Sequence, residues 1–184
     1  MKKILLILAD GFEEIEAVGT ADILRRMKFE VTLAGLNGRQ VTASHGTRVM
    51  ADALLDEADP AEFAALVLPG GMPGAINLYN DSRVEALLRE FHRQGKVTAA
   101  ICAAPMVLDK AGLLDHRRFT MYPDEALFRY LKPGHRPQPD MAVTDGMVIT
   151  GKGPGATPVF AAAIAAALGA PDTLIRGHIA GMFF

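Results

Sequence analysis

Cys102 is the only cysteine in the chain, and it stands where the sequence changes character. The apolar run Val97–Ile101 leads directly into it, and Ala103, Ala104 and Pro105 follow, ahead of a helix-forming segment. This order predicts a strand, a sharp turn that carries the sulfur, and the start of a helix. Free N–H groups and the positive end of a helix dipole favour the thiolate, which is the reactive form of cysteine. The alternative is a small buried residue in an apolar turn, since free cysteines are often buried and inert.

Three carboxylates, Glu13, Glu14 and Glu16, cluster at one predicted helix start. For Glu13 and Glu14 the expectation is a solvated helix N-terminus, where negative charge suits the helix dipole. Glu16 differs because its neighbours in the sequence are apolar, so a carboxyl aimed inward there would need a partner. The thiol of Cys102 is a candidate. A glutamate kept protonated by burial can donate a hydrogen bond to a thiolate and carry protons to and from a substrate.

Gly70 and Gly71 follow an apolar run at 65–68 and offer backbone N–H groups at a sharp turn. Beside a cysteine such groups can form an oxyanion hole, and the alternative is an ordinary strand-to-loop turn. The segment lacks a Walker lysine and the GxGxxG spacing, so we expect no phosphate site. His45 precedes Gly46, and a lone histidine is more often structural or superficial than catalytic.

Composition narrows the class of protein. The chain has 184 residues, of which 50% are hydrophobic and 22% charged, as expected for one globular domain over 1–184. Its formal net charge of −2 gives no reason to expect nucleic acid or an anionic membrane as partner. We expect no secretory signal, no membrane span and no internal disulfide, which fits the cytoplasm. The five histidines lack zinc-site spacing, so we expect no metal.

Apolar runs alternate with helical patterns along the chain, which predicts a mostly parallel sheet between helices. The predicted strands are 3–9, 30–36, 65–68, 97–101, 119–122 and 147–150, with short extended pieces at 41–44 and 48–52. The predicted helices are 14–27, 84–94 ending at Gly95, and one capped by Thr157, with Pro158 at its first position, that ends at Gly169. Residues 132–140 are expected to form an irregular loop. Ligand sites in such sheets lie beyond the carboxyl ends of the strands, so Cys102, the glycine turn and the acidic cluster should converge there.

Four segments together resemble the ThiJ/PfpI superfamily, in its Parkinsonism-associated deglycase branch. They are residues 7–16, 67–71, 99–105 and 153–155, and they stand in the family's order over nearly the whole chain.

This resemblance implies a flavodoxin-like α/β sandwich with helices on both faces of the sheet. Cys102 matches the reactive cysteine on the family's nucleophile elbow, and Glu16 matches the carboxyl that touches it. Gly71 and Ala103 match the backbone donors of the oxyanion hole. The family is typically homodimeric and cofactor-free, and Ile15 is then a candidate dimer contact.

The chain departs from the family pattern in two places. Ala103 stands where the protease-like branch has a histidine, which disfavours a cysteine peptidase. Tyr122 aligns where the deglycase branch often has a histidine, and tyrosine does not easily replace imidazole near neutral pH. His45 is a second candidate for this role, and it would supply the imidazole from the same chain or from a dimer partner.

Two functions remain open from these residues. The first is a cysteine-dependent, cofactor-free glyoxalase or deglycase that acts on methylglyoxal-like dicarbonyls or on glycated amines. The second is a redox-sensing stress or chaperone protein in which Cys102 is oxidised rather than catalytic. Both functions depend on the same thiol, so sequence alone does not separate them.

Overall fold

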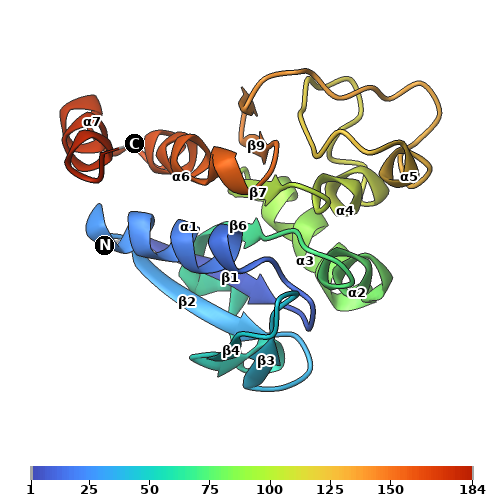
Figure 1. Cartoon of the computed structure of the whole chain (residues 1–184), viewed down its shortest axis with the longest axis horizontal. Helices are drawn as coiled ribbons and strands as arrows, with labels where there is room; N and C mark the ends of the chain where they lie inside the picture. The colour runs from blue at the N-terminus through green and yellow to red at the C-terminus, as the bar shows by residue number, and fades with distance from the viewer. Residues whose placement is uncertain (1, 184) are drawn as a thin grey trace.

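A computed structural model describes residues 2–183 and is built around a seven-stranded sheet (Figure 1). In spatial order its strands are β5 (Ala53–Leu54), β2 (Glu30–Gly35), β1 (Lys3–Leu8), β6 (Phe63–Leu68), β7 (Val97–Ile101), β9 (Val148–Gly151) and β8 (Ala142–Asp145). Every neighbouring pair is parallel except β8 and β9. A separate antiparallel hairpin joins β3 (Gln40–Thr42) to β4 (Arg48–Met50). The predicted α/β fold with a mostly parallel sheet is confirmed.

The sheet is covered on both faces, which explains why its central strands are apolar without alternation. In β1, Leu5 and Ile7 belong to one hydrophobic core, and Ile4 and Leu6 belong to the other. The first core also contains side chains of α2 (Gly74–Asn80), α3 (Ser82–Arg93) and α4 (Pro105–Lys110). The second contains side chains of α1 (Glu14–Arg26), α6 (Thr157–Ala167) and α7 (Asp172–Gly181).

Helix ends agree with the sequence signals at two glycines and differ at one threonine. Gly95 and Gly169 follow α3 and α6 with φ of 67° and 85°, the left-handed conformation that ends helices. The prediction that Thr157 caps α6 is wrong, and Ala156 occupies that position. A single 3₁₀ turn, Pro154–Ala156, already bends the chain, so Thr157 is the first helical residue and its hydroxyl donates to the Pro154 carbonyl at 2.8 Å.

The predicted strand at 119–122 does not form, and the prediction failed because side chains replace the ladder there. The Thr120 N–H donates to the Thr150 hydroxyl at 2.9 Å, and the Thr120 hydroxyl approaches the carbonyls of Gln138 and Asp140 at 2.9 and 2.8 Å. The elements α2, α7, β5 and β8 were not predicted, and neither was a one-turn helix at 125–128.

The segment after residue 122, which includes the short helix α5 (Glu125–Phe128), is fixed in place by a buried carboxylate. Asp109 on α4 has no exposed surface and accepts the Lys132 N–H at 2.6 Å. Its other oxygen bonds Nδ1 of His135 at 2.5 Å. Residues 132–140 form the expected irregular loop, and this bonding fixes the loop against the body of the protein.

Within residues 2–183, we find no helix with both the length and the apolar character that crossing a bilayer requires.

Candidate active site

The segments after β1, β6 and β7 meet at the carboxyl edge of the sheet. The Glu13 N–H, from the segment after β1, donates to the carbonyl of Gly70, from the segment after β6, at 3.0 Å. The Cys102 N–H, directly after β7, donates to the Gly151 carbonyl of β9 at 2.9 Å. The convergence predicted from the topology is therefore present, and it brings the glycine turn between the acidic cluster and the cysteine.

Cys102 stands on a sharp turn between β7 and α4, as the sequence predicts. Its φ of 65° lies in the left-handed region, which is uncommon for a residue with a side chain. The Ala104 N–H closes the turn by donating to the Ile101 carbonyl at 3.0 Å, and the Tyr122 N–H donates to the Cys102 carbonyl at 2.8 Å. Strained backbone of this kind clusters at functional sites, because the surrounding structure must hold it in place.

Glu16 is fully buried and faces the thiol rather than solvent. One carboxyl oxygen, Oε2, accepts the Gly70 N–H at 2.8 Å, while Oε1 has no hydrogen-bond partner among the described residues. Burial raises the pKa of Glu16 from 4.5 to about 7, although the bonds to Gly70 and to Cys102 act in the opposite direction. The carboxyl therefore exchanges a proton easily near neutral pH.

Gly70 lets the three parts of the site approach one another. A Cβ atom at this position would lie 2.6 Å from Cβ of Cys102 and 2.8 Å from Oε2 of Glu16. Both distances are well inside van der Waals contact, so any side chain here would push the thiol and the carboxyl apart. This is a packing requirement, separate from the backbone freedom of glycine.

The environment of Cys102 corrects one expectation from the sequence. Burial and the negative charge of Glu16 raise the pKa of the thiol well above its ordinary value, instead of favouring the thiolate at rest. The backbone N–H groups of Gly71 and Ala103 approach the sulfur and lower its pKa, but they do not outweigh the burial. The following helix α4 has only six residues, so its dipole adds little.

A cavity of about 490 Å³ opens over the sulfur. Its lining includes Cys102, Gly71 and Ala103 on one side, with His45 and Tyr122 also facing the same space. Glu16 is not part of the lining, because it lies buried beneath the thiol. The cavity therefore brings together these five candidate residues, and Glu13 borders it as well. His45 and Tyr122, the two candidates to replace the missing histidine, both line it.

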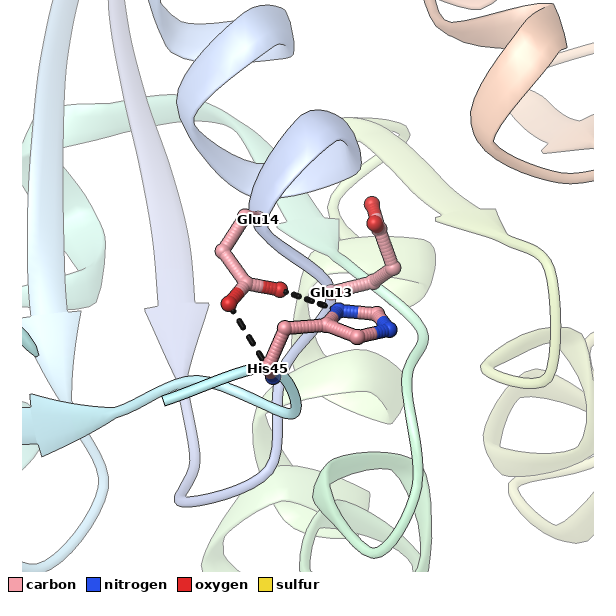
Figure 2. Close-up of side chains that lie close together, drawn as sticks. All are labelled: Glu13, Glu14 and His45. Atoms are coloured by element: carbon pink, nitrogen blue, oxygen red, sulfur yellow. Dashed lines mark hydrogen bonds and ion pairs between the residues drawn. The ribbon is translucent and has the colours of Figure 1, made fainter. Parts of the chain in front are cut away.

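Glu13 and Glu14 are not the solvated helix start that the sequence suggested. Glu13 is buried and caps α1, accepting the Glu16 N–H at 2.7 Å. Glu14 bonds His45 of the β3–β4 turn, at 2.9 Å to Nδ1 and 3.0 Å to the backbone N–H (Figure 2). Nothing in the local sequence signals this pairing, since 31 positions separate the two residues.

Two groups of side chains hold oxygen and nitrogen atoms within 4.8 Å of one another, as a metal site would. They are Glu13, Glu14 and His45, and Asp109, Asp115 and His135. In the first group Glu14 and Nδ1 of His45 already bond each other, and Glu13 caps a helix. In the second, the Lys132 ammonium lies 2.7 Å from Asp115. We therefore interpret both groups as hydrogen-bonded ion-pair networks.

The pKa of Glu16 gives a prediction for stability. Because the folded protein holds this proton up to about pH 7 and the unfolded chain releases it near pH 4.5, the free energy of unfolding should fall as pH rises through that window. The expected fall is on the order of 3 kcal/mol. Glu16→Gln keeps the shape of the carboxyl and cannot ionise, so it should lack this contribution. Urea unfolding of both proteins at several pH values across this window isolates the contribution of Glu16. If the free energy of unfolding depends on pH in the same way in both proteins, the assignment is contradicted.

Comparison with known proteins agrees with this geometry. Residues 2–167 match the DJ-1/PfpI family. Drosophila melanogaster protein dj-1beta is 40% identical over 166 residues, which are 89% of this chain and 88% of that protein. Deglycase TK1284 of Thermococcus kodakarensis is 38% identical over 118 residues, covering 64% of this chain and 70% of that protein. The solved structure of oxidized Toxoplasma gondii DJ-1 superposes with a TM-score of 0.91 at 30% identity, covering 100% of this chain and 99% of that one. The chain belongs to the DJ-1/PfpI family.

Proposed function

We propose that this protein is a cytoplasmic, cofactor-free enzyme of the glyoxalase or deglycase type, acting on methylglyoxal-like dicarbonyls or their adducts with amines. The observation that carries the proposal is the contact between a thiol and a buried carboxyl whose pKa is about 7, under a cavity of about 490 Å³. The similarity to a protein named deglycase supports the same reaction class.

The pair of Cys102 and Glu16 supplies the nucleophile although the thiol is protonated in the resting protein. Near pH 7 a fraction of Glu16 is ionised, and this carboxylate takes the thiol proton as sulfur attacks the aldehyde carbon. The new oxyanion forms beside the Gly71 and Ala103 N–H groups, which both approach the sulfur. Glu16 then returns the proton to this oxygen, and the product of the step is a hemithioacetal.

Glu16 next moves a hydrogen between the two carbons of the dicarbonyl. It takes the proton from the aldehyde-derived carbon and returns it to the neighbouring carbon, which turns the hemithioacetal into a thioester of a 2-hydroxy acid. Water hydrolyses the thioester, and the acid and the free thiol are released. Methylglyoxal and water together thus become lactate, with no external oxidant or reductant.

Two substitutions separate the roles in this scheme. Cys102→Ala should lower methylglyoxal turnover at least ~1,000-fold, because it removes the nucleophile. Glu16→Gln should lower turnover nearly as far, while Cys102 remains open to alkylation. Lactate formation measures the first effect, and intact mass after iodoacetamide measures the second. Full activity of Cys102→Ala would contradict the mechanism.

A redox-sensing stress or chaperone protein is the second candidate, and one observation favours it. Oε1 of Glu16 is buried without a hydrogen-bond partner among the described residues, so a protonated Glu16 has a free donor next to the sulfur. With two molecules of hydrogen peroxide, the thiol becomes a sulfinate and two molecules of water form. A gain of two oxygens at Cys102 in a protein that lacks glyoxalase activity would favour this candidate.

We also propose that the protein is a homodimer that pairs through α1. Ile15 is 58% exposed, and it borders a largely apolar hollow of about 590 Å³ together with Ile23, Pro158 and Met182. Val18 of the same helix and Val159 of α6 are also exposed. Exposed apolar patches of this kind are typical of surfaces that pair with another protein.

Ile15→Asp should dissociate the dimer, because it places a charge in the centre of this apolar surface. Met50→Asp is the matched control, since Met50 is equally apolar and 65% exposed on β4, outside that surface. Sedimentation velocity reports the mass of each variant. If the wild-type protein and both variants all sediment as dimers, α1 is not the interface.

A further inference from the structure

The turn that carries His45 is fixed to the segment after β1 by backbone hydrogen bonds. The Ser44 N–H donates to the Phe12 carbonyl at 2.8 Å, and the Gly11 N–H donates to the Thr42 carbonyl at 2.7 Å. These bonds place the β3–β4 turn at the cavity that lies over Cys102, although the hairpin is not part of the main sheet.

Glu14 fixes the imidazole of His45 in one orientation. Its Oε1 accepts the His45 backbone N–H at 3.0 Å, and its Oε2 lies 2.9 Å from Nδ1 and 3.2 Å from the Ser44 hydroxyl. Partial burial acts to raise the pKa of Glu14, but the bonds from the His45 side chain and from nearby backbone N–H groups lower it to about 2. Glu14 is therefore an anion, and Nδ1 of His45 carries a proton toward it.

The second ring nitrogen of His45 is available to a ligand. Nε2 has no hydrogen-bond partner within residues 2–183, and in Figure 2 it points away from Glu14. The His45 side chain is 76% exposed and borders the same cavity as Cys102. The charged groups near this ring are Glu13, which caps α1, and Glu14, the first residue of that helix. Asp124 and Arg129 also lie on the cavity lining.

The proposed reaction needs a second acid–base group. When Glu16 takes the proton from the first carbon, the oxygen on the second carbon must gain a proton to form an enediol. When Glu16 returns the proton to the second carbon, the oxygen on the first carbon must lose one. Glu16 carries the carbon-bound proton between these two halves, so during the isomerisation a different residue must serve the oxygens.

We propose that His45, oriented by Glu14, is the catalytic acid–base residue that protonates and deprotonates the substrate oxygens at Cys102. This inference rests on the proposed function. In the first half of the isomerisation, Nε2–H gives its proton to the oxygen on the second carbon. In the second half, Nε2 takes the proton from the oxygen on the first carbon, so the imidazole ends as it began and no proton is gained or lost.

Glu14 acts as a positioning residue in this arrangement, and it favours the protonated ring. Its hydrogen bond and its charge raise the pKa of His45. A protonated imidazole is the form that donates in the first half of the step, so activity should decline as pH rises through the pKa of His45. Without the Glu14 charge this decline should move to lower pH.

The test compares methylglyoxal turnover in the wild-type protein, His45→Gln and Glu14→Gln, with His92→Gln on α3 as the matched control. General acid–base groups typically contribute 10²–10⁴-fold, so His45→Gln should lower kcat by about 100-fold or more with little change in KM. Glu14→Gln should shift the alkaline limb of the kcat profile to lower pH. His92→Gln should behave as the wild type, since this residue does not line the cavity.

Two readouts separate an acid–base role from a structural one. The rate of Cys102 alkylation should be unchanged in His45→Gln, and added imidazole should restore turnover to His45→Ala. If wild-type protein turns over methylglyoxal, Cys102→Ala does not, and His45→Gln keeps kcat within about twofold of wild type, the inference about His45 is overturned while the proposed function stands. If wild-type protein shows no turnover, both are overturned.

Discussion

The site depends on the contact of the fully buried Glu16 carboxyl with Cys102 and with the Gly70 N–H. A buried carboxyl is costly unless it is hydrogen-bonded or neutral, and here one oxygen takes the Gly70 N–H while burial raises the pKa to about 7. The same burial raises the pKa of the thiol. The two groups therefore form a coupled pair that shares a mobile proton, and each group changes the pKa of the other.

The scaffold around this pair is arranged to keep the two groups together. Strands β1, β6 and β7 end side by side, and two hydrophobic cores, one on each face, both pack against the cysteine. Gly70 has no side chain to separate the thiol from the carboxyl, and the left-handed backbone of Cys102 aims the sulfur at the cavity edge. The hairpin turn with His45 and the loop held by Asp109 complete the surroundings without contributing to the main sheet.

The fold and the centre of the site could be predicted from the sequence because both follow from local patterns. Continuous apolar runs identify buried parallel strands, and the turns after them locate Gly70, Gly71 and Cys102. Predictions failed where distant contacts decide the outcome. Glu13 and Glu14 match a solvated helix start, yet Glu13 is buried as a cap and Glu14 meets a residue 31 positions away. Likewise, the elevated pKa of the Cys102 thiol follows from burial beside Glu16, which no local pattern encodes.

The measurement that tests the shared proton most directly is the pH dependence of Cys102 alkylation in the wild-type protein and in Glu16→Gln, followed by intact mass. The alkylation midpoint of the wild-type protein should lie above the ordinary thiol value of ~8.5, because burial and the Glu16 charge oppose the thiolate. In Glu16→Gln the midpoint should move to lower pH, since the variant removes that charge. A wild-type midpoint at or below the ordinary value, or the same midpoint in both proteins, would contradict the account.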